Sequence, residues 1–299
     1  EFRRVLFRSA VKIYHHCGIQ LLYIRLFQYI CAPLKKRRMI KALFFDIDGT
    51  LVSFNTHEIP SSTLAAIAEA KAKGIKIFIA TGRPKAIINN LTALQERELI
   101  DGYITMNGGY CFVEDEVIYK HSIPVQDVKA LAALSDERNF PCIFVAEHTV
   151  AVCNTNKLVN EIFHDFLHVD ILPIQTTAEA TQAEIFQMTP FITTEEEKTV
   201  LPLLPNCESG RWFPAFTDIV AKGIRKQKGI DEIIRHFGIG QEETMAFGDG
   251  GNDISMLRHA AIGVAMGNAN DDVKETADYI TTSVDEDGIQ KALKHFGII

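Results

Sequence analysis

A short apolar strand that runs directly into two carboxylates is the feature that most constrains this chain. Ala42–Phe45 reads as a buried strand, and Asp46, Asp48, Gly49 and Thr50 follow it at once. One of two carboxylates placed two residues apart can attack an electrophile while the other moves a proton, and both can lie beside a hard cation. The turn residues let the chain leave the strand sharply and point backbone N–H groups at an anion. The alternative is a solvated loop after the strand.

A second acidic loop of the same kind occurs late in the chain. Thr244–Phe247 reads as another short buried strand, and a glycine-rich turn follows it with Asp249, Asn252 and Asp253. Two acidic loops that each follow a strand are typical of one Mg²⁺ site at the carboxyl edge of a parallel sheet. Capping of the next helix by Asn252 or Asp253 is the simpler interpretation, and it is compatible with metal binding.

Short apolar runs alternate with amphipathic segments through most of the chain. Such runs suit a parallel sheet that is covered on both faces, and their alternation with helices favours a doubly wound, Rossmann-like α/β core. The strands expected in this core are Lys41–Phe45, Ile75–Ala80, Gly102–Met106, Thr244–Phe247, Ile262–Met266 and Tyr279–Thr281.

The middle of the chain has a different pattern, in which hairpins are interleaved with helices. This pattern predicts an inserted α+β cap domain that interrupts the core. Its later strands are expected at Arg211–Phe216 and Ile219–Val220. The expected divisions are an extension at 1–38, a first core part at 39–121, the cap at 122–221 and a second core part at 222–299.

Residues 1–38 contrast with the rest in charge. They hold nine Lys or Arg against one acidic residue, whereas the 299-residue chain as a whole has a net charge of −7. An apolar stretch near the basic run ending at Arg38 contains Arg25, which is costly in a membrane span. We therefore expect the extension to be non-native or disordered, and we expect no membrane or nucleic-acid partner for the body of the chain.

The six cysteines form no C-x-x-C pair and show no zinc-like spacing. This usage favours reduced thiols in a cytoplasmic protein. The sequence contains no feature from which the oligomeric state can be read.

Four short motifs follow one another along the chain. They are Asp46-Ile47-Asp48-Gly49-Thr50, Thr81-Gly82-Arg83, Lys226 and Gly248–Asp253. Their order is similar to that of the motifs of the haloacid dehalogenase (HAD) superfamily of phosphohydrolases. The long gap between the second and third motifs resembles the Cof-type sugar-phosphatase branch, which carries a large C2-type cap. The likeness spans Met39 to Ile299.

The chemistry of the residues and this resemblance together suggest a role for each motif. Asp46 is expected to be the nucleophile and Asp48 the general acid/base. The expected metal is Mg²⁺, because the ligands carry only oxygen: Asp46, Asp48, Asp249 and Asp253. The resemblance implies that Asp48 contributes its backbone carbonyl.

Other motif residues are expected to hold the phosphate. Thr81 and Gly82 follow a core strand with a hydroxyl and backbone amides, although a plain turn would look the same. The resemblance selects Lys226 among neighbouring lysines, and Asn252 would bind phosphate or orient Lys226. Arg83 and Asn107 are candidate substrate contacts, but the first could be an exposed helix-start residue and the second a turn.

The predicted activity is therefore that of a Mg²⁺-dependent phosphomonoesterase acting on small phosphorylated metabolites, most simply hexose phosphates, through an aspartyl-phosphate. One alternative is a phosphomutase that uses the same aspartyl-phosphate chemistry. A phospho-Asp signalling module is a weaker alternative, because an acid/base at Asp48 would shorten the life of the phosphorylated state.

Overall fold

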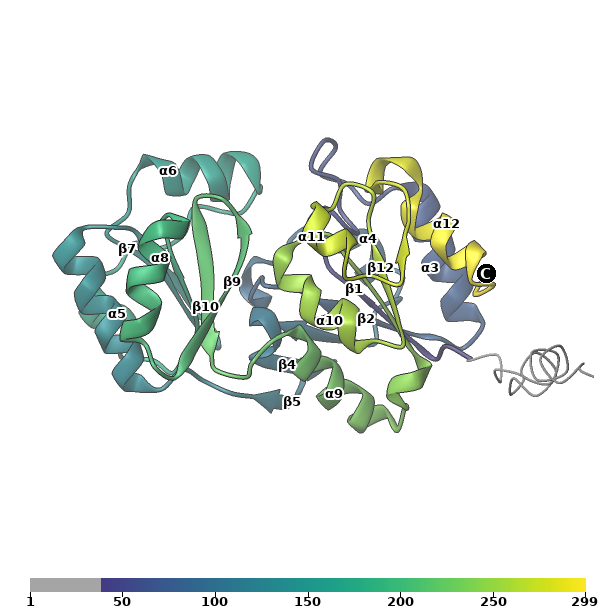
Figure 1. Ribbon diagram of the computed structural model, residues 1–299, viewed down its shortest axis with the longest axis horizontal. Coiled ribbons are helices and arrows are strands. Elements are labelled where there is room, and N and C mark those ends of the chain that lie inside the picture. The colour runs from purple at the N-terminus through teal and green to yellow at the C-terminus, as the bar shows by residue number, and fades with distance from the viewer. Residues whose placement is uncertain (1–38) are drawn as a thin grey trace, which may run out of the picture. The chain divides into compact units, whose positions relative to one another are not determined.

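Two β-sheets, one of eight strands and one of five, organise the part of the chain that the structure describes, residues 39–299 (Figure 1). The structure is a computed structural model. Contacts divide the chain into residues 1–39 and residues 40–299, and both sheets belong to the second unit. The prediction made for residues 1–38 lies outside the described residues.

The eight-stranded sheet is the predicted α/β core. All six expected strands belong to it and pair in parallel. Two further strands extend the sheet in antiparallel fashion at one edge. In spatial order the strands are β13 (Tyr279–Ile280), β12 (Ile262–Ala265), β11 (Thr244–Gly248), β1 (Ala42–Phe45), β2 (Lys76–Ala80), β3 (Gly102–Thr105), β4 (Tyr110–Val113) and β5 (Glu116–Lys120).

The core sheet buries both of its faces, as its strand sequences predict. Successive side chains of a strand point to opposite faces. Leu43 and Phe45 of β1 therefore pack in one cluster with α3 (Ser61–Ala72) and α12 (Gly288–His295). Ala42 and Phe44 pack in another with helices on the opposite face, α9 (Lys226–Phe237), α10 (Ile254–His259) and α11 (Asp271–Lys274). The doubly wound fold class is confirmed.

Short helical turns complete the core connections. They are η1 (Lys85–Ile87), α4 (Thr92–Gln95), η2 (Met106–Gly108), η5 (Gln241–Glu243), η6 (Gly251–Asp253) and η7 (Val284–Glu286).

The second sheet lies within the segment expected to form the cap, and all its strands are antiparallel. Its spatial order is β7 (Val150–Cys153), β6 (Cys142–Ala146), β8 (Ile185–Pro190), β10 (Phe216–Ala221) and β9 (Cys207–Phe213). Its helical elements are α5 (Val125–Arg138), α6 (Lys157–Asn160), the π-helical η3 (Glu161–Phe166), α7 (Thr177–Ala180), α8 (Thr194–Val200) and η4 (Leu201–Leu203).

Three further details of the fold bear on the sequence-based predictions. The strand expected at Arg211–Phe216 is only partly right: β9 ends at Phe213, and the chain turns before β10 begins at Phe216, because Pro214 has no N–H to give to a ladder. Cys111, Cys142, Cys153 and Cys207 are free and buried, as expected. Among residues 39–299, no helix has the length and apolar character that crossing a bilayer requires.

Candidate active site

The first, second and fourth motifs follow three neighbouring strands, so they lie at one edge of the core sheet. β11, β1 and β2 are adjacent and parallel, so their carboxyl ends meet. Asp46 follows β1, Thr81 follows β2, and Asp249 follows β11. Residues that are about 200 positions apart in the chain are thereby placed around one cavity.

Lys226, the first residue of α9, binds the Asp46 carboxylate directly. Its Nζ lies 2.5 Å from Asp46 Oδ1 and 2.5 Å from Asp253 Oδ1, and the lysine side chain is fully buried. Burial alone would lower the pKa of Lys226, but the charges of Asp253 and Asp46 outweigh it and raise that pKa. Lys226 is therefore a permanent cation beside Asp46.

The Asp46 carboxyl has the opposite balance. Burial raises its pKa well above the usual range, and the negative charge of Asp253 adds to this effect, while Lys226 opposes it. A carboxylate in this position is crowded by like charge that a single lysine does not offset. The site therefore favours a further positive charge.

Asp249 is held from two sides. Thr50 Oγ1 donates to its Oδ1 at 2.7 Å, and Asn268 Nδ2 lies 3.3 Å from its Oδ2. Gly49 has a φ of +83°, and a Cβ there would come within 2.2 Å of Asp249 Oδ2, so this turn requires glycine. Burial and the nearby Asp253 raise the pKa of Asp249 to about 7.

Asp253 has partners other than those expected of a metal ligand. Its Oδ1 accepts from Lys226, and its Oδ2 accepts the backbone N–H groups of Asp249 at 3.0 Å and Gly250 at 2.9 Å. The side chain is fully buried and does not line the cavity. This geometry makes Asp253 a support that fixes the acidic loop and Lys226.

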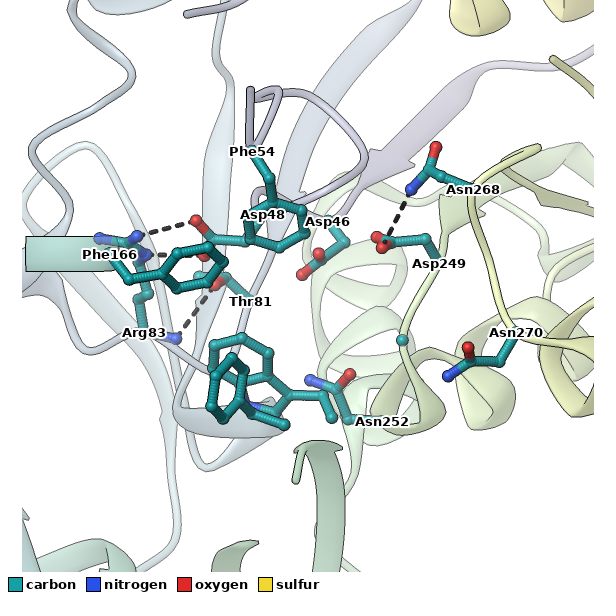
Figure 2. Close-up of a pocket in the computed structure, with 14 residues that line it drawn as sticks. Asp46, Asp48, Phe54, Thr81, Arg83, Phe166, Asp249, Asn252, Asn268 and Asn270 are labelled. Atoms are coloured by element: carbon teal, nitrogen blue, oxygen red, sulfur yellow. Dashed lines mark hydrogen bonds and ion pairs between the residues drawn. The ribbon is translucent and has the colours of Figure 1, made fainter. Parts of the chain in front are cut away.

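Arg83 contacts Asp48. Its Nε and Nη2 donate to the two carboxylate oxygens of Asp48 at 2.7 and 2.8 Å, a bidentate pair (Figure 2). Nη2 also lies 3.3 Å from the carbonyl oxygen of Leu167, which belongs to the segment predicted as the cap. The guanidinium thus links the expected acid/base to that segment.

Asn107 does not line the cavity but contacts Asn252, which does. Its Oδ1 accepts from Asn252 Nδ2 at 3.0 Å, and its Nδ2 donates to Asp218 Oδ2 at 3.0 Å and Gln187 Oε1 at 3.1 Å. Asn107 therefore joins Asn252 of the last motif to β8 and β10. The geometry supports a connecting role rather than direct contact with substrate.

The cavity itself has a volume of about 190 Å³ and brings most of the predicted residues together. Three predicted residues do not line the cavity: Lys226, Asn107 and Asp253. Each of them forms a hydrogen bond with a residue that does line it. The predicted residues in its lining are Asp46, Asp48, Thr81, Gly82, Arg83, Asp249 and Asn252.

Several lining residues were not predicted from the sequence. Asn268 and Asn270 follow β12, and the rule that polar residues after a core strand face the site would have found them. Phe54, Phe166, Trp212 and Phe213 make up the aromatic part of the lining. They carry no motif, and only the fact that Trp212 is the sole tryptophan of the chain set one of them apart.

The oxygen donors fit a divalent cation. Asp46, Asp249 and Asp253 each offer one carboxylate oxygen, and these oxygens lie within 4.8 Å of one another. Asp253 is fully buried and bound to Lys226 and two backbone N–H groups, whereas Asp46 and Asp249 line the cavity, so Asp46 and Asp249 are the two carboxylates that an ion in the cavity could reach. An all-oxygen set of this kind suits Mg²⁺.

Comparison with known proteins identifies the class. Residues 43–293 match the family model of the haloacid dehalogenase-like hydrolases, and the chain belongs to this family. It is a HAD-type phosphatase, a hydrolase of phosphoric monoesters, which confirms the resemblance found in the four motifs.

Individual relatives cover nearly the whole described chain. A solved structure of the HAD subclass IIB sugar phosphatase BT4131 is 69% identical, with a TM-score of 0.85, and covers 87% of this chain and 100% of its own. YkrA of Bacillus subtilis (strain 168) is 35% identical over 87% of this chain and 98% of YkrA. The 5-amino-6-(5-phospho-D-ribitylamino)uracil phosphatase YcsE of the same organism is 30% identical over 86% of this chain and 96% of YcsE.

Proposed function

We propose that the protein is a Mg²⁺-dependent phosphatase of small sugar phosphates, hexose phosphates in particular, that works through an aspartyl-phosphate on Asp46. The observation that carries this proposal is the position of Asp46. Its carboxylate lines the cavity, is paired with the buried Lys226 at 2.5 Å, and lies in the same lining as Asp48 and Asp249.

In the first half of the reaction, an oxygen of Asp46 attacks phosphorus and the bond from phosphorus to the sugar oxygen breaks. Asp48 gives its proton to that leaving oxygen, so the free sugar departs as an alcohol. To do this, Asp48 must release Arg83 and carry the proton that it takes from water in the second half of the preceding cycle. Lys226 balances charge on Asp46 and on the transferred phosphoryl group.

In the second half, water attacks phosphorus and Asp48 takes the proton of that water. The bond from phosphorus to Asp46 breaks, which releases inorganic phosphate and restores the carboxylate. Thr81, Gly82 and Asn252 would hold the phosphoryl oxygens throughout. The phosphoryl group passes to water rather than to a second hydroxyl, and this separates the proposal from the phosphomutase alternative.

Asp46, Asp249 and the backbone carbonyl of Asp48 would hold Mg²⁺. When bound, the cation would offset the crowded carboxylate charge and polarise a phosphoryl oxygen. Burial first, and the neighbouring Asp253 second, raise the pKa values of Asp46 and Asp249; these directions support the assignment, since a bound divalent cation would favour the charged form of both carboxylates.

The size of the cavity supports a compact substrate. A volume of about 190 Å³ is smaller than the roughly 300–1,000 Å³ of pockets for drug-sized ligands. The name of the 69% identical BT4131, a sugar phosphatase, supports a sugar as the leaving group. YcsE is named for a phosphoribityl substrate, so relatives of this chain differ in the organic part they accept.

The test is release of inorganic phosphate by the purified chain with Mg²⁺, using hexose, pentose, triose and nucleoside monophosphates and a phosphopeptide. We expect turnover of hexose and pentose phosphates and none of the phosphopeptide. A phosphopeptide as the best substrate would overturn the substrate assignment. Conversion of a hexose phosphate to its isomer, without free phosphate, would instead establish the mutase.

A further inference from the structure

The lining of the cavity has two chemically distinct sides. Carboxylates and amides form one side, with Asp46, Asp249, Asn268 and Asn270 among them. The other side is a run of rings, which we call the aromatic wall: Phe54, Phe166, Phe213 and Trp212. In Figure 2, Phe54 and Phe166 lie to the left of Asp46 and Asp249, away from Asn268 and Asn270.

The rings of the aromatic wall are in continuous contact. Phe54 stacks on Phe166 with centroids 5.5 Å apart, Phe166 lies 5.8 Å from Phe213, and Phe213 lies 6.0 Å from Trp212. Phe216, which is fully buried, supports the last two from behind at 5.3 and 5.1 Å. Phe166 is nevertheless 38% exposed. A ring that is backed by packing but open toward the cavity offers an apolar surface to a ligand.

The tryptophan is fixed by a buried carboxylate. Its Nε1 donates to Asp218 Oδ2 at 3.1 Å, the oxygen that also accepts from Asn107, while Asp218 Oδ1 accepts from Thr189 Oγ1 at 2.7 Å. Asp218 is only 3% exposed, and its carboxylate accepts hydrogen bonds from the side chains of Asn107, Thr189 and Trp212. It therefore holds the Trp212 ring at one orientation beside the phosphate-binding residues.

We propose that the aromatic wall is the subsite for a cyclic leaving group, and that Asp218 is a positioning residue for it. This proposal rests on the function proposed above and specifies its substrate. A sugar ring has a face of C–H groups that can lie on an aromatic surface, and hydroxyls at its edge that amides can bind. An open-chain polyol keeps these hydroxyls and carries one more in place of the ring oxygen, but it has no such face. The enzyme thus selects cyclic sugar phosphates over open-chain ones.

The matched pair of substrates is glucose 6-phosphate and glucitol 6-phosphate, which share the phosphorylated primary oxygen and differ in the ring. With Mg²⁺, we expect the unchanged enzyme to favour glucose 6-phosphate in kcat/KM by about tenfold or more. Trp212→Ala should remove this preference, mainly through KM for glucose 6-phosphate, and should change glucitol 6-phosphate by less than about threefold. Trp212→Phe, which keeps a ring, should retain most of the preference.

Asp218 is tested by a conservative pair. Asp218→Asn keeps an oxygen for Trp212 Nε1 and should retain the preference, whereas Asp218→Ala should reduce it as Trp212→Ala does. Folding of each variant is checked by thermal unfolding. A second measurement leaves Trp212 in place and uses its fluorescence, since it is the only tryptophan of the chain. In the Asp46→Asn variant with Mg²⁺, which should not turn over its substrate, this fluorescence should change on binding of glucose 6-phosphate and much less on binding of glucitol 6-phosphate.

Equal kcat/KM for the two substrates in the unchanged enzyme would overturn the subsite while leaving a sugar phosphatase in place. An equal loss on both substrates in Trp212→Ala would overturn it as well. Absence of phosphate release from every sugar phosphate would instead overturn the proposed function.

Discussion

The carboxylate side of the cavity and the aromatic wall are built in opposite ways. Asp46 and Asp249 each follow directly on a buried core strand, so their positions are set within a few residues of a rigid element. Phe166 and Phe213 come from separate elements, η3 and β9, and meet only because the second sheet packs as it does. The difference suggests that the first side supplies chemistry common to all substrates and the second supplies selection among them.

The sharpest way to break this comparison is to remove the nucleophile. Asp46→Asn should lower kcat by about 10⁴-fold or more on every substrate alike, because the covalent step is lost. The fold should persist, since Lys226 keeps Asp253 as a partner at 2.5 Å. Steady-state phosphate release and circular dichroism measure the two effects. A kcat within tenfold of the unchanged enzyme would refute the assignment.

Removal of the metal should affect all substrates equally, as Asp46→Asn does. EDTA should abolish phosphate release from all substrates, and Mg²⁺ should restore it. Ca²⁺ should not, because its longer bonds and looser coordination would misplace the attacking Asp46 carboxylate. Activity is measured after dialysis and re-addition of each ion. Full turnover in EDTA would contradict a metal role for Asp46 and Asp249.

Lys226 gives an effect on both activity and stability. Lys226→Met leaves the carboxylates of Asp46 and Asp253 uncompensated, so we expect kcat to fall about 10²–10³-fold. Without Mg²⁺, the free energy of unfolding should fall by about 3–5 kcal/mol. Urea unfolding and phosphate release measure these changes.

The matched control lies on the same helix. Lys228 pairs with Glu232 at 2.6 Å and has a side chain that is 34% exposed. Lys228→Met should change the unfolding free energy by less than about 1 kcal/mol and leave kcat nearly unaltered. Equal effects of the two substitutions would show that the third motif was assigned to the wrong lysine.

The sequence was sufficient for the parts of the molecule that depend on local order. The core strands, the doubly wound class and the family were all predicted, because strand periodicity and the four motifs are local signals. Contacts between distant parts of the chain could not be predicted, because no local pattern encodes them. The pairing of Arg83 with Asp48, and the aromatic wall, depend on tertiary packing in the same way. The roles assigned to the site residues remain predictions.

The smallest expected effect comes from a charged residue at the other edge of the same sheet. Asp101 precedes β3 and accepts from Lys71 Nζ at 2.6 Å, Lys76 Nζ at 2.8 Å and the backbone N–H of Ile77 at 2.9 Å. Burial alone would raise the pKa of Asp101, but these hydrogen bonds outweigh it and lower that pKa below 3.8. A depressed carboxyl pKa contributes stability that is present above the unfolded value and is lost as the pH falls through the folded value.

Asp101→Asn should therefore lower the unfolding free energy by about 1–2 kcal/mol at pH 7. This difference should shrink as the pH falls below 3.8, where the unfolded carboxyl is already protonated. Glu69→Gln, which removes an exposed pair with Lys73, is the control and should cost less than about 1 kcal/mol. Neither change should alter kcat/KM, because both lie away from the cavity lining. If the unfolding free energies of the original chain and Asp101→Asn differ by the same amount at pH 7 and pH 3, Asp101 acts through packing rather than charge. If Asp101→Asn loses activity, the carboxyl edge of the sheet is sensitive to charge at its amino edge.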